Sequence, residues 1–135
     1  LNLIPIKTIF EKDKFLKRNS AISIWPGSTT ISGFEVHHGK SYEIPHSPIE
    51  IKPLCKENSL GWVTNNDSSL NIAGTYLHGI FDNGKWRRLW INTLRTEKGL
   101  EKLKVDEPDY FQKRESLINK LTDQFNQNIN LKPLL

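Results

Sequence analysis

The predicted fold depends on the stretch Gly74-Thr75-Tyr76-Leu77-His78-Gly79-Ile80-Phe81-Asp82-Asn83. It is a short apolar and aromatic run that contains one histidine and stops at a glycine and a turn. We expect Leu70 to Phe81 to form a strand, with Tyr76, His78 and Ile80 on one face, because side chains alternate along a strand. Ligands bind where the strands of an open α/β sheet end. His78 is therefore a candidate catalytic base.

The residues that follow this stretch predict two helices. Asp82 or Asn83 can cap the first helix, Gly84 to Lys98, through a side-chain oxygen, and Gly99 is placed to end it. A second helix is expected to begin near residues 106–108 and to fade at Asn130. One face of the first helix is apolar at helical spacing and predicts core packing; its residues are Trp86, Leu89, Trp90, Thr93 and Leu94.

The residues before this stretch predict strands and connections. Thr29 to Lys40 predicts a strand that places Glu35 and His37 on one face. These two residues are either functional or part of the solvated face of a half-exposed strand. Ala21 to Trp25 predicts a short strand, and the charged segment from Glu11 to Arg18 predicts a surface connection.

Composition limits the classes of protein to consider. The chain has 135 residues, a net charge of +4 and one cysteine, Cys55, which indicates one small domain in a reducing, cytoplasmic compartment. Its basic residues are mixed with 15 acidic ones, so we expect no nucleic-acid partner. No apolar run approaches the roughly 20 residues that span a membrane. The chain contains no methionine, and we expect a C-terminal piece of a longer polypeptide.

Other candidate sites are weaker than His78. Cys55 is a poor candidate nucleophile, because Leu54 and Lys56 beside it are too large for a strained nucleophile turn. The four histidines, His37, His38, His46 and His78, have no partners at zinc-ligand spacing, so we predict no metal site. The chain also lacks the G-x-x-x-x-G-K-[ST] phosphate loop, and no cofactor is expected to bind it.

Two motifs together resemble a known family. Gly33-Phe34-Glu35-Val36-His37-His38-Gly39-Lys40 resembles the G-Y-E-I-H-x-G-R segment of cobyric acid synthases. Gly74 to Asn83, followed by Arg87-Arg88, resembles their G-T-Y-L-H-G-x-F-D-N segment. The resemblance implies an α/β fold: residues 1–135 would be the C-terminal part of a class I glutamine amidotransferase-like (flavodoxin-like) domain, with a mixed sheet and C-terminal helices. The nucleophile elbow and an N-terminal ATP-binding synthetase domain would lie upstream.

The same resemblance implies an activity. The family uses ATP and glutamine-derived ammonia to amidate corrinoid side-chain carboxylates, converting adenosylcobyrinic acid a,c-diamide to cobyric acid in cobalamin biosynthesis. Its partners would be glutamine, the corrinoid and the synthetase domain of the same chain. ATP and Mg²⁺ would be bound by the full-length enzyme and not by this fragment, which alone would be inactive. His78 matches the histidine that assists the elbow cysteine.

One position departs from ordinary class I enzymes, which place a glutamate two residues after the histidine to orient its ring. Here that position is Ile80, a departure that resembles the cobyric acid synthase branch, and Glu35 is a candidate for the orienting group. Two alternatives remain open. One is the glutaminase subunit of a cell-wall lipid precursor amidotransferase, and the other is a non-catalytic amidotransferase-like binding domain.

Overall fold

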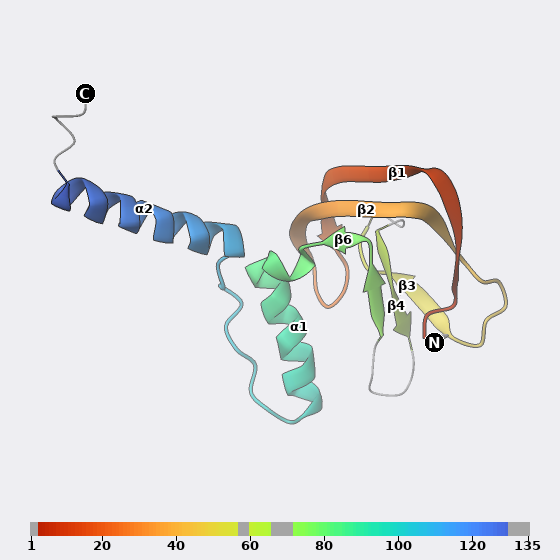
Figure 1. The fold of residues 1–135 in the computed structure, drawn as a ribbon. Helices are drawn as coiled ribbons and strands as arrows, with labels where there is room; N and C mark the ends of the chain where they lie inside the picture. Colours follow the sequence, from red (N-terminus) through yellow and green to blue (C-terminus); the bar gives the residue numbers. More distant parts are fainter. Residues whose placement is uncertain (1–2, 57–59, 66–71, 130–135) are drawn as a thin grey trace.

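The fold consists of two small antiparallel sheets and two helices (Figure 1). The computed structural model describes residues 3–56, 60–65 and 72–129. One sheet has the strand order β1-β2-β6 and the other β3-β4-β5. The elements are β1 (Ile6–Ser23), β2 (Thr29–Glu43), β3 (Glu50–Pro53), β4 (Gly61–Asn65), β5 (Ala73–Thr75), β6 (Leu77–His78), the 3₁₀ helix η1 (Ile80–Asp82), α1 (Gly84–Glu97) and α2 (Tyr110–Asn128).

This architecture confirms the α/β class in its coarse sense. Every strand pairing among the described residues is antiparallel, so the parallel part of the predicted mixed sheet does not lie there. No helix in the described part of the chain is long and apolar enough to cross a bilayer.

The first sheet is built on a long hairpin of β1 and β2. The prediction of a surface connection from Glu11 to Arg18 is wrong, because β1 runs through this segment. Its pairing with β2 is interrupted only by an irregularity between Phe10 and Phe15. Most of β1 is exposed, so charged side chains are tolerated along it without a desolvation cost. A charged sequence therefore concealed a strand that backbone pairing stabilises.

The stretch around His78 does not form one strand. β5 belongs to one sheet and β6 to the other, and the chain bends between them at Tyr76. Thr75 Oγ1 holds the bend: it donates to Leu60 O at 2.6 Å and accepts from Leu77 N at 3.0 Å. Ile80 follows in η1 and is buried. The prediction that Tyr76, His78 and Ile80 share a face is therefore wrong, and Leu70 lies outside the described residues.

The core lies between the sheets and α1. The predicted packing of α1 is confirmed for Trp86, which is buried, and for Trp90, which packs against the core from a partly buried position. The Trp86 indole Nε1 donates to Trp25 O at 3.1 Å. The buried apolar residues of the core are Ala21, Ile31, Leu54, Cys55, Leu60, Val63, Leu77, Ile80 and Trp86.

One carboxylate holds the beginnings of both helices. Neither Asp82 nor Asn83 caps α1 with its side chain; instead Gly84 N donates to Asp109 Oδ1 at 2.6 Å. Asp109 is also the N-cap of α2 and forms a capping box with Gln112. The helix ends match the prediction closely, with Gly99 in the left-handed region (φ 66°) after α1.

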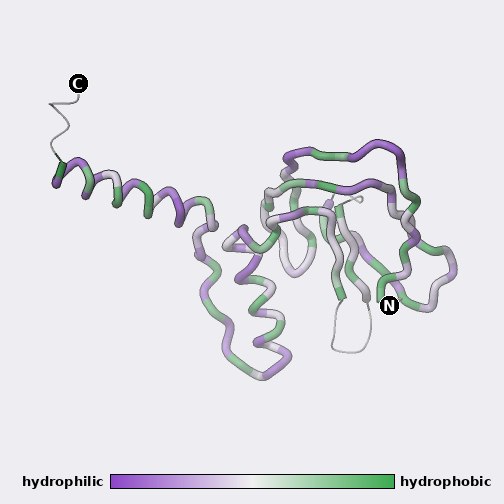
Figure 2. Tube along the Cα trace, in the orientation of Figure 1, coloured by the Kyte–Doolittle hydropathy of each residue, from purple (hydrophilic) through white to green (hydrophobic). Residues whose placement is uncertain are grey.

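The two helices differ in burial. No residue of α2 is buried, and green apolar side chains recur along its exposed length (Figure 2). The connection before α2 is tied back to α1 by Glu107, which pairs with Lys113 and Arg88. The hydrogen bond from Lys113, followed by the one from Arg88, lowers the pKa of the Glu107 carboxyl.

A side-chain amide extends the short pairing of β2 with β6. Only Phe34 with His78 and Glu35 with Leu77 pair there as backbone. Next to them, Asn83 Oδ1 accepts from Ser32 N at 2.8 Å, and its Nδ2 donates to Ser32 O and to Ile80 O, each at 2.9 Å. Asn83 is buried, so these bonds replace ones to water. The amide thus fixes η1 against β2.

We predict that Asp109→Ala loosens the first turns of both helices. Each loses a capped end worth about 1 kcal/mol, which is roughly a fivefold faster exchange of the local amides. Hydrogen exchange of residues 84–88 and 110–114 in the intact protein measures this. Asp106→Ala, an exposed acid in the same connection, is the control. Faster exchange at only one helix would contradict the shared cap.

We also predict that Asn83→Asp weakens the attachment of η1 to β2. A carboxylate cannot donate to Ser32 O or Ile80 O, so two buried carbonyls lose their partner at a cost of about 2 kcal/mol. That cost corresponds to a roughly thirtyfold faster exchange of residues 77–83. Asn126→Asp on the exposed surface of α2 is the matched control. Equal exchange in the two variants would show that the amide bonds contribute nothing.

Candidate functional site

His78 is the last residue of β6 and its side chain is exposed. Two glycines make this position possible. A Cβ on Gly33 would lie 2.2 Å from His78 O, so only glycine lets β2 approach so closely. Gly79 has a φ of 81°, which ends the strand and turns the chain into η1. The predicted location of His78 at the end of a strand, just before a strand-to-helix connection, is therefore confirmed.

Three strands place a row of side chains on the face of His78. Arg18 on β1 pairs with Phe34 on β2, and Phe34 pairs with His78 on β6. Directly paired residues of antiparallel strands point to the same side of the sheet. The Arg18 guanidinium carbon lies 5.2 Å from the centroid of the Phe34 ring, a distance at which cation and ring attract each other.

A cavity of about 520 Å³ opens beside this row. It lies between the first sheet, η1 and the beginning of α2, and it contains both basic and acidic side chains. Besides His78 and Phe34, its lining includes Arg18, Ser32, Asp82, Asn83, Asp109, Tyr110 and Arg114. A cavity with opposite charges and an exposed imidazole can hold a small polar ligand beside a base.

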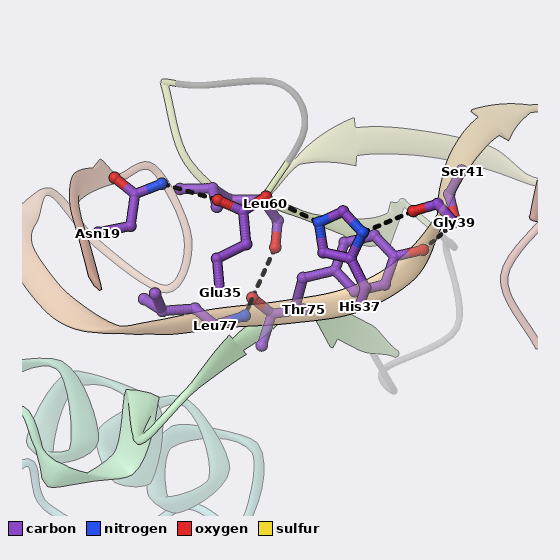
Figure 3. Close-up of polar contacts among 9 residues, drawn as sticks. Asn19, Glu35, His37, Gly39, Ser41, Leu60, Thr75 and Leu77 are labelled. Atoms are coloured by element: carbon purple, nitrogen blue, oxygen red, sulfur yellow. Dashed lines mark hydrogen bonds and ion pairs between the residues drawn. The ribbon is translucent and has the colours of Figure 1, made fainter. Parts of the chain in front are cut away.

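Glu35 lies on the other face of β2, away from His78. It pairs with Leu77, whereas His78 pairs with Phe34, and successive side chains of a strand point to opposite sides. Its carboxylate accepts from Asn19 Nδ2 at 2.9 Å and pairs with His37 Nε2 at 2.9 Å (Figure 3). The hypothesis that Glu35 orients His78 is therefore wrong.

The buried pair of Glu35 and His37 has a structural role. His37 Nδ1 lies 2.6 Å from Gly39 O, so both ring nitrogens face acceptors, and a ring that carries both protons satisfies both. The His37 ring stacks between Phe15 and Tyr76, with centroids 5.2 and 4.3 Å away. The interpretation of Glu35 and His37 as a solvated strand face is also wrong, because both point inward.

This polar cluster holds the bend that leads to His78. The Tyr76 hydroxyl hydrogen-bonds Ser41 Oγ, and the Tyr76 ring contacts Trp62 of the second sheet edge to face. Tyr76 is thus fixed by residues of both sheets just where the chain passes from one to the other. The motif from Gly33 to Lys40 supports β6 from behind and does not enter the cavity through its acid.

The remaining candidates lie apart from the cavity. Cys55 is completely buried in the core, which agrees with its poor standing as a nucleophile. Among the described residues, no group of three or more His, Cys, Asp or Glu side chains is placed to hold a metal ion. Sequence reasoning missed Arg18, Asp109 and Arg114 as cavity residues, because only the register of β1 and the position of α2 bring them to His78.

Comparison with known proteins identifies the family. The model of the CobB/CobQ-like glutamine amidotransferase domain matches residues 1–86. The chain is 52% identical over 135 residues to a cobyric acid synthase of the cyanobacterium Prochlorococcus marinus, covering 100% of this chain and 27% of the relative. For the cobyric acid synthases of a second P. marinus strain (MIT 9313) and of Synechococcus sp. (strain CC9311), the identities are 46% over 135 residues and 45% over 139, with the same coverage.

The chain therefore spans about a quarter of the length of the relatives it matches. No solved structure matches it. The match to the family model includes the first sheet, the bend at Tyr76 and the strand that ends at His78. The chain belongs to the CobB/CobQ-like glutamine amidotransferase domain family.

Proposed function

We propose that this chain supplies the histidine of a glutamine-hydrolysing site in a cobyric acid synthase. The observation that supports this most is the exposed ring of His78 at the end of β6, on the wall of a charged cavity. The names of relatives that match the whole chain favour amidation of corrinoid carboxylates over a cell-wall lipid precursor. The class I amidotransferase fold is part of this proposal.

The chemistry needs a thiol from a part of the protein outside this chain. His78 takes the thiol proton, and the thiolate attacks the side-chain amide carbon of glutamine. The C–N bond then breaks while the imidazolium gives its proton to the leaving nitrogen, which departs as ammonia. Water attacks the thioester with His78 as base, the C–S bond breaks, and glutamate is released.

The other reactants belong to the rest of the proposed enzyme. Ammonia would pass to a synthetase domain that uses ATP and Mg²⁺ to activate the corrinoid carboxylate. We assign ATP and Mg²⁺ to that domain, because this chain has no phosphate-binding loop. Its described residues also offer no cluster of ligands for a metal ion. The cavity beside His78 is assigned to glutamine, whose ammonium and carboxylate groups suit its mixed charges.

We predict that His78→Asn in the intact enzyme lowers glutamine-dependent amidation by about 10²- to 10⁴-fold, because the site loses its general acid and base. Amidation with free ammonia should persist, since it needs no glutamine hydrolysis. Product formation with each nitrogen donor measures both.

His46→Asn is the matched control. His46 is exposed and adopts a φ of 58°, which asparagine tolerates. Full glutamine use by the His78 variant would refute the proposed role, and so would loss of both activities together.

A further inference from the structure

The position that carries the orienting acid in ordinary class I enzymes cannot supply one here. Ile80 is 6% exposed and belongs to the core, so its side chain faces away from the cavity of His78. An imidazole that alternately accepts and donates a proton benefits from a carboxylate that fixes its orientation and stabilises its cationic form. The question is which carboxylate in the structure can take this place.

Two of the three nearby carboxylates are already engaged. Glu35 lies on the opposite face of β2 and is bonded to Asn19 and His37. Asp109 lines the cavity, but it accepts from Gly84 N and caps α2. Asp82 also lines the cavity, and no hydrogen bond or ion pair engages its carboxylate among the residues that the structure describes.

The turn after His78 directs Asp82 back toward it. Gly79 adopts the left-handed conformation, and Asp82 N donates to Gly79 O at 2.9 Å, which closes the turn. The Asp82 carboxylate folds over this turn, since its Oδ2 lies 3.1 Å from where a Cβ of Gly79 would be. The acid therefore sits beside the residue that directly follows His78. Asn83 fixes the turn to β2, so the placement is rigid.

The charges around the cavity give this carboxylate a purpose. Arg18 on β1 and Arg114 on α2 both line the cavity and disfavour a second positive charge there. An imidazolium at His78 is consequently destabilised unless an anion lies close to it. Asp109 and Tyr110 on the α2 side complete the set of titratable groups that face the cavity. The carboxylate of Asp82 is the nearest in sequence, on the same turn.

We propose that Asp82 is the positioning residue of His78, accepting a hydrogen bond from the ring nitrogen that faces away from the thiol. Asp82 takes no proton during the reaction; the thiol proton moves to His78 and then to the leaving ammonia. The carboxylate fixes the orientation of the ring and stabilises its cationic form. This inference rests on the proposed glutaminase role of His78.

The test compares Asp82→Asn, Asp82→Glu and Asp123→Asn in the intact enzyme, with glutamine and with free ammonia as nitrogen donor. Asp123 is exposed on α2 and lies outside the cavity lining. Asp82→Asn should lower kcat for glutamine hydrolysis by about 10²-fold with little change in KM. The alkaline limb of its pH profile should move to lower pH, because the imidazolium loses a neighbouring anion. Asp82→Glu should recover part of the rate.

The outcomes separate this inference from the proposed function. If His78→Asn abolishes glutamine use and Asp82→Asn leaves kcat and the pH profile unchanged, the role of Asp82 is refuted while that of His78 stands. If Asp82→Asn loses ammonia-dependent activity in parallel, its effect is structural and the inference also fails. A loss confined to glutamine use, with the displaced pH profile and unchanged Asp123→Asn, supports it.

Discussion

The pairing of β6 with β2 is the contact on which the placement of His78 depends. Only two residues of β6 pair as backbone, which is too little to hold a strand by itself. The pairing persists because Gly33 lets the strands approach and because the amide of Asn83 continues the ladder at Ser32. A buried side chain thus performs the work of a third strand residue, and His78 is held at the edge of the cavity.

The two faces of β2 divide structure from chemistry. On the inner face, Glu35 and His37 form a buried pair that supports the bend at Tyr76. On the outer face, Arg18, Phe34 and His78 form a row beside the cavity. A buried ion pair contributes little net stability unless all of its partners are present. Here Asn19 and Gly39 provide those partners, so the pair specifies one arrangement of the crossing strand.

The same division explains what could be predicted from the sequence. The α1 helix, its apolar face and the strand-end position of His78 follow from local periodicity and glycine signals, and the structure confirms them. The continuity of β1 through Glu11 to Arg18 could not be predicted, because backbone pairing with a distant strand decides it. The face of Glu35 was predictable, but whether that face is buried depends on the packing of β4 and Tyr76 behind it.

Long-range partners are the other part that local patterns miss. Asp109 follows Gly84 by 25 residues, and a capping rule applied to neighbouring residues selects Asp82 or Asn83 instead. Arg114 enters the cavity only because α2 begins beside α1. Family resemblance supplied the role of His78, whereas the arrangement of charges around it came from the fold.

The distance between the His78 ring and the nearest cysteine sulfur tests the central claim most directly. It can be measured in an experimentally determined structure of the intact protein that contains this chain. The account predicts a cysteine on a glycine-flanked turn, with its Sγ about 3–4 Å from a ring nitrogen of His78. A ring that faces solvent or another side chain, with no thiol in reach, would contradict it.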